Sequence, residues 1–556
     1  MTRVIPPAPS RSGHQDGFAR ANLPPPGQWP DFHFDLPQLR YPERLNCVTE
    51  LLDRAVERGG AERIALIGEH AGEHGGEHER LTYAQLLARV DRIAHVLRRD
   101  LGLVSGNRVL LRGANTPTMA ACILAVFKAG MVAVPTMPLL RARELGKIID
   151  KAKVDAVLCA AGLRGEIDAL EGAAPVVCFG ASAGAGAEAG SLESHMARHD
   201  DRFAPCDTAA DDVCLISFTS GTTGVPKATM HFQRDVLAVC DCFPPHMLGS
   251  TPDDIFIGTP PLAFTFGLGG LLLFPLRVGA AGVLLEKPSP EILLAAIERH
   301  GATVCFTAPT FYRQMAALAP RFDLSHLRCS VSAGEALPLA TRDAWRAATG
   351  LEMIDGIGAT ELLHIFISAA GDQVRPGATG KPVPGYQACI LDDDGVEVGI
   401  GVVGRLAVKG PTGCRYLADE RQCEYVVNGW NLTGDAYERD CDGYYHYRSR
   451  TDDMIISAGY NIAGVEVEEV LLRHPAVAEC AVVGYGDAER GQVVTAFVVL
   501  RDGVGASQAM AGALQDFVKQ TIAPYKYPRS VRFLDRLPRT ETGKLQRFKL
   551  RSGDAG

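Results

Sequence analysis

The order of apolar and polar positions predicts alternating helices and strands over the first two-thirds of the chain. Apolar residues recur with helical spacing over 82–100 and 116–130. Short apolar runs, typical of buried strands, lie after these segments at 108–113 and 131–138. Strands and helices that alternate in this way form βαβ units, so we expect a largely parallel sheet.

The same pattern returns further along the chain and then changes. Residues 213–390 hold a second series of buried strands, which begins with VCLISFTS. From about 390 to 450, Asp-Gly and Gly turns predict antiparallel hairpins, and the residues after about 453 predict a small α+β module. The Pro-rich residues 1–45 predict an extended arm that lies on the main body.

The composition excludes several classes of function. Hydrophobic residues make up 47% of the 556 residues, enough for a large core, and the formal net charge is −9. A chain of this charge is a poor candidate for general nucleic-acid binding. The uncharged stretch 258–276 contains three prolines, so we expect a buried passage there and no membrane span. The 15 cysteines form no Cys-x-x-Cys pair, which indicates reduced thiols in a cytoplasmic protein.

The segment TSGTTGVPK at 219–227 is the strongest candidate for a phosphate-binding loop. It follows an apolar strand directly, its hydroxyl and amide groups can donate to phosphate oxygens, and Lys227 adds a positive charge. The P-loop pattern requires Ser or Thr after the Lys, but Ala228 stands there, so a P-loop nucleotidase is disfavoured. Because isolated Gly- and Thr-rich turns are common, this loop alone leaves phosphate binding open.

Four further segments carry glycines, carboxylates and cations in an order that chance explains poorly. They are DGIGATE at 355–361, NLTGD at 431–435, RSRTDD at 448–453 and PRTETGK at 538–544. Each also has a plain structural interpretation as a turn or a helix cap. Together they contain the groups that a nucleotide site requires.

With these motifs the chain resembles the adenylate-forming superfamily, which includes acyl- and aryl-CoA synthetases, luciferases and adenylation domains. The resemblance extends from LTYAQL at 81–86 to GKLQR at 543–547. The segments DGIGATELLHIFIS, SAGEALP and TGKPVPGY are similar to benzoate-CoA ligases, and DDMIISAGYNIAG and the arm to 2-aminobenzoate-CoA ligases. The resemblance implies that an aromatic acid, best 2-aminobenzoate, is activated by ATP as an acyl-adenylate and then transferred to CoA.

The resemblance also implies a domain organisation. We expect a large α/β domain of βαβ-type sheets with a distorted β-barrel subdomain, followed by a small mobile α+β domain. The arm would span 1–45, the AMP-binding domain 46–451 and the C-terminal lid 452–556, which would rotate about Asp452 between the half-reactions. The expected partners are a small aromatic carboxylic acid, ATP, CoA and Mg²⁺, with neither nucleic acid nor membrane, in a monomer or homodimer.

Each matching position receives a role from the resemblance. Lys544, Thr360 and Glu361 would be catalytic, with Glu361 as the Mg²⁺ ligand and Lys544 a point charge at the developing transition state. The nucleotide would be bound by Thr219, Ser220, Gly221, Thr222, Thr223, Gly224, Lys227, Ala333, Gly334, Glu335, Asp355, Gly356, Ile357, Asp435 and Arg450. A pantetheine tunnel would be formed by Ser457, Ala458, Gly459 and Tyr460, and an aryl pocket by Phe264, Thr265, Phe266, Gly358, His364 and Ile365.

The aryl pocket carries the hypothesis about the substrate. Two phenylalanines and an isoleucine suit a flat ring, although core packing explains them as well. His364 or Thr265 would accept a hydrogen bond from an ortho-amino group; the alternative for His364 is a structural hydrogen bond. Three positions depart from the family pattern: Ile357 replaces a common aromatic residue, Ile456 a common Lys and Asn461 a common Arg.

Other functions stay open at this point. They are a ligase for benzoate, hydroxybenzoate or a medium-chain acid, a stand-alone adenylation enzyme that loads a carrier protein, and a nucleotide-binding regulator without turnover. A carrier module with a Gly-x-Ser attachment turn is missing from the sequence, which favours free CoA as the acceptor.

Overall fold

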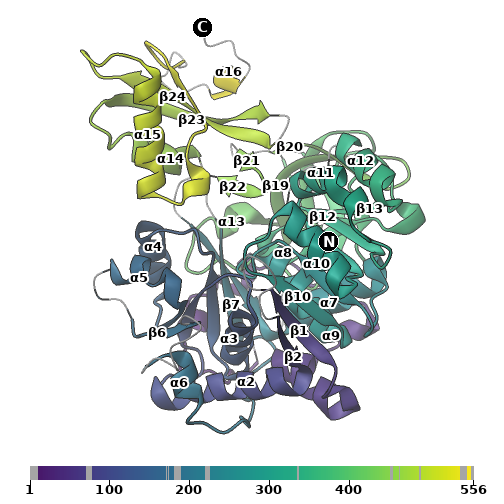
Figure 1. The fold of residues 1–556 in the computed structure, drawn as a ribbon. Coiled ribbons are helices and arrows are strands. Elements are labelled where there is room, and N and C mark those ends of the chain that lie inside the picture. Colours follow the sequence, from purple (N-terminus) through teal and green to yellow (C-terminus); the bar gives the residue numbers. More distant parts are fainter. Residues whose placement is uncertain are drawn as a thin grey trace.

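A computed structural model describes residues 10–69, 78–170, 172, 174–180, 190–219, 226–334, 337, 339–392, 394–450, 455–462, 464–487, 490–538 and 547–551. These residues form a large body built on three sheets and a smaller C-terminal module with a sheet of its own. In Figure 1 the module lies above the body, at the yellow end of the colour scale. The predicted fold class, a large α/β domain followed by a small α+β domain, is confirmed.

The first sheet of the body has six strands in the order β6-β5-β3-β4-β7-β8. Every neighbouring pair is parallel except β7 with β8, which is antiparallel. The strands at 108–113 and 131–138 predicted from the sequence are β3 and β4. The bounds are β3 (Arg108–Arg112), β4 (Val132–Thr136), β5 (Ala156–Ala160), β6 (Val176–Phe179), β7 (Val213–Thr219) and β8 (Lys227–Phe232).

The second sheet has nine strands in the order β15-β14-β13-β12-β11-β9-β10-β1-β2. The central strands are parallel, and antiparallel strands close both edges. The bounds are β1 (Ile64–Glu69), β2 (Glu79–Thr82), β9 (Ile255–Gly258), β10 (Ala281–Leu285), β11 (Val304–Thr307), β12 (Cys329–Ala333), β13 (Met353–Gly358), β14 (Ile365–Ser368) and β15 (Lys381–Pro382).

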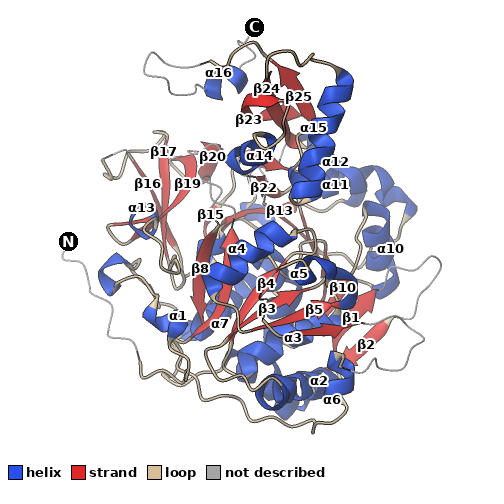
Figure 2. Cartoon of the chain, turned by 90° about the vertical axis from the view of Figure 1, so that its left-hand side faces the viewer, coloured by secondary structure: helices blue, strands red, loops and turns tan. Residues whose placement is uncertain are grey.

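Two smaller sheets complete the fold, and Figure 2 shows both at the upper part of the molecule. A five-stranded antiparallel sheet occupies the region predicted to form hairpins, with β16 (Gln387–Leu391), β17 (Gly404–Lys409), β18 (Val426–Val427), β19 (Trp430–Arg439) and β20 (Tyr445–Arg450). The C-terminal module contains β21 (Ile455–Ser457), β22 (Tyr460–Ile462), β23 (Val477–Asp487), β24 (Gly491–Leu500) and β25 (Ser530–Phe533).

The helices begin where the sequence provides caps. The hydroxyl of Thr82 accepts from the backbone of Gln85 at the start of α2 (Tyr83–His95), and Thr116 caps α3 (Pro117–Lys128) in the same way. The other long helices are α4 (Ala142–Ala152), α7 (Gln233–Phe243), α10 (Pro290–His300), α11 (Pro309–Leu318), α12 (Leu339–Thr349), α14 (Gly464–Leu471) and α15 (Gln508–Thr521). Shorter ones are α1 (Phe18–Ala21), α5 (Gly165–Asp168), α6 (Leu192–Met196), α8 (Thr265–Leu268), α9 (Phe274–Val278), α13 (Gln422–Tyr425) and α16 (Arg547–Arg551).

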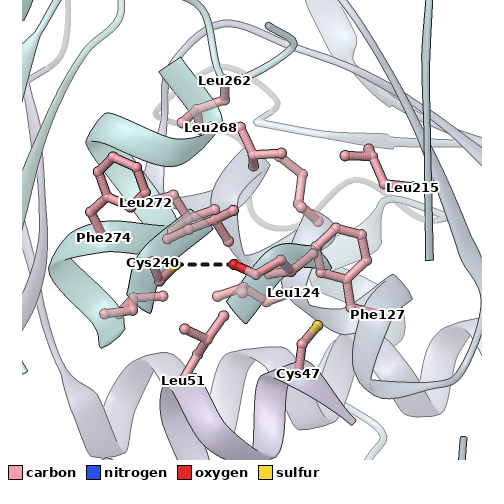
Figure 3. Close-up of a cluster of buried hydrophobic side chains, with 14 of the residues drawn as sticks. Cys47, Leu51, Leu124, Phe127, Leu215, Cys240, Leu262, Leu268, Leu272 and Phe274 are labelled. Atoms are coloured by element: carbon pink, nitrogen blue, oxygen red, sulfur yellow. Dashed lines mark hydrogen bonds between the residues drawn. The ribbon is translucent and has the colours of Figure 1, made fainter. Parts of the chain in front are cut away.

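The main core lies where helices of the body meet between its sheets. Helix α3 contributes apolar side chains on all sides, including Leu124 and Phe127, because it is buried all round. Figure 3 shows these two residues beside Cys240 of α7 and Leu272, far apart in the sequence. The thiol of Cys240 donates to the carbonyl of Val236 at 3.1 Å, within a large cluster of buried apolar side chains.

The uncharged stretch 258–276 folds inside this core, as expected. It runs from the end of β9 through α8, a π-helical turn at Gly269–Leu273 and the start of α9. Leu268, Leu271 and Leu273 are fully buried within it. Among the residues that the structure describes, no helix combines the length and the apolar character needed to cross a membrane.

The described part of the arm lies along the body. Trp29 is buried, and its ring centroid lies 5.8 Å from that of Phe232 at the end of β8. The hydroxyl of Tyr41 donates to Asp241 of α7 at 2.7 Å. Aromatic anchors thus join residues 10–45 to two elements of the body.

Candidate active site

A cavity of about 1370 Å³ lies where the parallel strands of both large sheets end. Its walls are the segments that follow β3, β4 and β5 in the first sheet and β9, β10 and β12 in the second. The C-terminal module closes one side with Ala458, Gly459, Tyr460, Tyr525 and Lys526. Ligands of open α/β sheets bind beyond the carboxyl ends of the strands, so the topology itself marks this cavity as the candidate site.

The structure brings residues from the predicted catalytic, nucleotide-binding, tunnel and aryl-pocket groups to this cavity. Those that line it are Thr219, Phe264, Thr265, Phe266, Ala333, Gly334, Gly358, Thr360, His364, Ile365, Ala458, Gly459 and Tyr460. The other described candidates lie outside its lining; they are Lys227, Asp355, Gly356, Ile357, Glu361, Asp435, Arg450 and Ser457.

Some predictions concern residues beyond the described part of the chain. They are Ser220, Gly221, Thr222, Thr223, Gly224, Glu335, Asp452 and Lys544. The roles of these residues stay predictions, as does any contact made by the Arg450 side chain.

The ends of the predicted phosphate loop are held together by a strand pair. Thr219, the last residue of β7, lies opposite Lys227, the first residue of β8. The ammonium group of Lys227 lies 5.3 Å from the ring centroid of Tyr416 and 5.9 Å from that of Tyr425. The two ends of the predicted loop therefore lie close together, and Thr219 and Pro226 line the cavity.

Glu361 lies directly after β13, in a short 3-10 turn with Thr360. The Glu361 side chain is 8% exposed, and its Oε1 atom accepts a hydrogen bond of 2.6 Å from the hydroxyl of Tyr416. Thr360 lines the cavity, whereas Glu361 lies just outside its lining. His231 of β8 lies next to the Thr360 backbone, and burial lowers its pKa to about 3, so its imidazole is neutral.

Two carboxyl groups predicted to lie near the nucleoside are brought together around Tyr437. Asp355 of β13 and Asp435 of β19 both act electrostatically on the Tyr437 hydroxyl. Burial raises the pKa of Asp355 to about 7, and its Oδ1 atom has no hydrogen-bond partner in the described part of the chain. The backbone register places Arg450 opposite Asp435.

His364 is the most unusual residue of the predicted aryl pocket. Its ring is 2% exposed and lies within 6.3 Å of the rings of Phe243, Phe266, Phe274 and Phe306, measured between centroids. Neither ring nitrogen has a hydrogen-bond partner among the described residues. Burial lowers the pKa of His364 to about 3, and the backbone of Phe266 offsets this only in part. The pocket thus holds a neutral imidazole with unused hydrogen-bonding capacity.

The predicted tunnel residues form a tight hairpin turn between β21 and β22. Ala458 and Gly459 have φ angles of 49° and 80°, the left-handed pair that a type I′ turn requires. The ring of Tyr460 stacks on that of Tyr525 with centroids 4.3 Å apart. Ile456 and Asn461, two of the departures from the family pattern, lie opposite each other in the same hairpin.

Sequence reasoning missed several residues that support the site. Asn115, which is buried and lines the cavity, donates to the carbonyl of Pro260 at 2.9 Å and accepts from the amide of Leu262 at 2.8 Å. It thereby fixes the segment that leads to the predicted aryl-pocket residues. Tyr416 is the second example, since it lies 55 residues from Glu361 in the sequence. No local motif marks either residue, because their roles depend on contacts between distant segments.

Comparison with known proteins identifies the family. The model of the AMP-binding enzyme family matches residues 52–416, and that of the AMP-binding enzyme C-terminal domain matches residues 466–544. The chain belongs to the AMP-binding enzymes. The predicted membership of the adenylate-forming superfamily, and of its benzoate-CoA ligase branch, is confirmed by these matches and by the relatives described next.

Among curated relatives, the benzoate–CoA ligase of Thauera aromatica is 36% identical over 525 residues, covering 93% of this chain and 97% of its own. The crystal structure of the anthranilate CoA ligase AuaEII in complex with anthranoyl-AMP is 32% identical, with a TM-score of 0.70 and coverage of 93% and 99%. The amide bond synthetase McbA of Marinactinospora thermotolerans is 30% identical, with a TM-score of 0.81 and coverage of 92% and 99%.

Proposed function

We propose that this AMP-binding enzyme is an ATP-dependent aryl-CoA ligase whose preferred acid is 2-aminobenzoate. The reaction class is supported by the similarity to a benzoate–CoA ligase over nearly the whole chain. The acid is supported by the neutral, hydrogen-bond-deficient imidazole of His364, which faces a cavity walled by aromatic rings. This imidazole is the observation that carries the substrate proposal.

In the first half-reaction, a carboxylate oxygen of the acid attacks the α-phosphorus of ATP. The new bond joins carboxylate oxygen to phosphorus, the bond to the bridging oxygen breaks, and pyrophosphate leaves with the electron pair. Both reactants are anionic, so cations and amide donors must offset their repulsion and hold them in line. Lys227, Thr360 and the loop 220–225 would hold the phosphates, and Lys544 would neutralise charge at the attack.

In the second half-reaction, the sulfur of CoA attacks the carbonyl carbon of the aryl-adenylate. A carbon–sulfur bond forms, the carbon–oxygen bond to AMP breaks, and the thiol proton is released to solvent. The Ala458–Tyr460 turn would border the path of the pantetheine arm, since it lines the same cavity as the aryl pocket.

Glu361 fits the role of a Mg²⁺ ligand. Mg²⁺ is usually held by one or two carboxylates together with water and substrate phosphates. Glu361 supplies one carboxylate, held by Tyr416, whose ring also lies 5.3 Å from the ammonium group of Lys227. The ion would supply positive charge to the phosphates of ATP. Asp435 would accept from the ribose hydroxyls, and Ala333 and Gly334 would border adenine, opposite the strand Asp355–Ile357.

The domain organisation completes the proposal. The arm would end at residue 45, and the AMP-binding domain would extend to residue 451. The lid would comprise 452–556 and turn about Asp452 between the half-reactions.

His364 and Thr265 would select the acid within the pocket. The amino group of 2-aminobenzoate can donate to a nitrogen of the neutral His364 ring, which otherwise lacks a partner among the described residues. The aromatic ring of the acid would pack against Phe264 and Phe266. Benzoate fills the same space but leaves the imidazole without its partner.

The proposed function is tested by measuring pyrophosphate release from Mg·ATP in the presence of each acid of a panel of aryl and alkyl acids. We expect release with 2-aminobenzoate to exceed release with benzoate, hydroxybenzoates and hexanoate, and 2-aminobenzoyl-CoA to form when CoA is added. Release without any CoA thioester would point to another acceptor, such as a carrier protein or an amine. Absence of release with every acid would refute the proposal.

A further inference from the structure

One buried lysine joins the C-terminal module to the large body. The ammonium group of Lys526 lies 2.6 Å from Oε1 of Glu144 and 2.9 Å from both carboxylate oxygens of Glu466. All three residues are at least 93% buried, with exposures of 4% for Lys526 and 7% for each glutamate. Each buried carboxylate thereby contacts a cation, as burial of a charged group requires.

The two carboxylates belong to different parts of the molecule. Glu466 lies on α14 of the C-terminal module, as Lys526 does on the turn Pro524–Lys526, whereas Glu144 lies on α4 of the large body. The contact of Lys526 with Glu466 is therefore internal to the module and independent of where the module sits. The contact with Glu144 exists only while the module is docked as seen here.

Glu144 receives a second donor from the module. The backbone amide of Ala523 donates to its Oε2 atom at 3.2 Å. The same atom accepts from the amide of Arg141 at 2.9 Å, which caps the first turn of α4. The carboxylate is thus oriented by its own helix and presented to two donors across the interface.

These residues also line the large cavity. Glu144, Glu466 and Lys526 contribute to its wall, and Tyr525 stacks on Tyr460, the residue that follows the Ala458–Gly459 turn. The contact between Glu144 and Lys526 therefore helps to hold the Ala458–Gly459 turn against the cavity. If the contact is lost, the module loses an ion pair with the large body close to that turn.

We propose that Glu144 and Lys526 form an interdomain latch that holds the C-terminal module in the arrangement used for acyl transfer to CoA. Both are positioning residues, which act through the Ala458–Tyr460 turn and touch no reacting atom. The assignment of the docked arrangement to acyl transfer rests on the proposed function. The latch breaks when the module rotates for adenylation, since Glu144 stays with the body while Lys526 and Glu466 move together.

The test uses the full chain and compares the two half-reactions in Glu144→Gln. Glutamine keeps an acceptor for the Arg141 amide, so α4 stays capped, but the charge facing Lys526 is lost. We expect thioester formation from supplied 2-aminobenzoyl-adenylate and CoA to fall about tenfold, and single-turnover pyrophosphate release without CoA to stay within about twofold of wild type. Glu291→Gln, which alters a surface ion pair with Arg321, is the control.

A charge exchange tests the pairing itself. Lys526→Glu alone leaves three carboxylates facing one another, and Glu144→Lys alone leaves two cations with one carboxylate. The double variant again has one cation and two carboxylates, so we expect it to recover most of the acyl-transfer rate lost by either single change. Equal loss of both half-reactions in Glu144→Gln, or no recovery in the double variant, would overturn the latch.

A measurement independent of turnover separates this proposal from the proposed function. Amide hydrogen exchange of the peptide around Ala523 is expected to accelerate in Glu144→Gln, because its carboxylate acceptor is weakened. Unchanged exchange would overturn the latch even in an active enzyme. Faster exchange in a protein that releases no pyrophosphate with any acid would support the latch and reject the proposed function.

Discussion

Tyr416 donates a hydrogen bond of 2.6 Å to Oε1 of Glu361, and both side chains are buried. The tyrosine follows β17 in the chain, whereas the glutamate follows β13 in another sheet. The ring of Tyr416 also faces the ammonium group of Lys227. Tyr416 thus orients Glu361, the proposed Mg²⁺ ligand, and contacts Lys227, which is proposed to bind the phosphates of ATP.

Replacing Tyr416 by Phe removes this hydrogen bond and keeps the ring. A hydrogen bond to a charged group contributes about 1.5–3 kcal/mol, so we expect adenylation to fall at least about tenfold, with a higher Mg²⁺ requirement. Pyrophosphate release as a function of Mg²⁺ concentration measures both effects. Tyr444→Phe, which removes a buried hydroxyl that donates to the Gln373 carbonyl away from the cavity, should leave the Mg²⁺ dependence unchanged.

Variants of the proposed aryl pocket should affect the activity with 2-aminobenzoate more than the activity with benzoate. Thr265→Ala and His364→Ala each remove a proposed acceptor for the ortho-amino group, worth about 1 kcal/mol as a neutral hydrogen bond. We expect kcat/KM for 2-aminobenzoate to fall about fivefold more than kcat/KM for benzoate, which lacks the amino group. Equal losses for the two acids would show that neither side chain accepts a hydrogen bond from the amino group.

Gly269→Ala should displace the imidazole of His364, because Gly269 packs directly against it. A methyl group on Gly269 would lie 2.4 Å from Cδ2 of the imidazole, closer than van der Waals contact allows. Alanine normally stabilises a helix by about 1 kcal/mol over glycine, yet here we expect a lower melting temperature and weaker binding of both acids. Gly512→Ala in α15, where no atom lies within 4 Å, is the matched control and should raise the melting temperature.

Buried neutral histidines should make the protein sensitive to acid. The folded-state pKa of His364 is about 3, below the ordinary 6.5, so between these values the unfolded state binds a proton that the folded state does not. Stability is therefore lost as the pH falls through that window, by about 2 kcal/mol per such histidine at pH 5.

His364→Gln removes this proton uptake. We expect the difference in unfolding free energy between pH 7.5 and pH 5, measured with urea, to be smaller in this variant than in wild type. His231→Gln should act in the same direction, since the pKa of His231 is also about 3. The exposed His326→Gln variant should keep the wild-type difference.

Breaking the buried ion pair between Arg415 and Asp235 should strongly destabilise the large body. Both side chains are fully buried and form an ion pair, with the guanidinium stacked 3.8 Å above the ring of Phe232. Arg415→Met leaves the carboxylate unpaired, so we expect a loss of about 3–5 kcal/mol in unfolding free energy. Arg415→Met with Asp235→Leu should recover most of it; a double variant as unstable as the single one would contradict this account.

Much of the fold follows from local patterns. The capping residues Thr82 and Thr116 set the starts of α2 and α3, and the predicted apolar runs form β3, β4 and β7. These patterns succeed because the hydrogen bonds that cap a helix, and the continuous apolar runs of buried strands, involve residues that are close together in the sequence. The motif residues of the cavity, such as Thr360 and Gly459, were identified through the resemblance to the adenylate-forming superfamily, which rests on short runs of neighbouring residues.

The supporting contacts were not predictable in this way. Asn115, Tyr416 and the latch of Lys526 with Glu144 join segments up to 382 residues apart. Nothing in the neighbourhood of these residues distinguishes them from other polar positions. Which partner each one meets depends on how the sheets and the module pack.

The sequence by itself determined the order of the elements, the nucleotide motifs and the family, because each of these depends on short runs of neighbouring residues. Only the tertiary structure decided that His364 lies among four phenylalanines, that Tyr416 holds Glu361 and that Lys526 bridges two parts of the molecule. The reason is physical. Desolvation and charge pairing depend on everything that surrounds a side chain, and those surroundings come from distant segments.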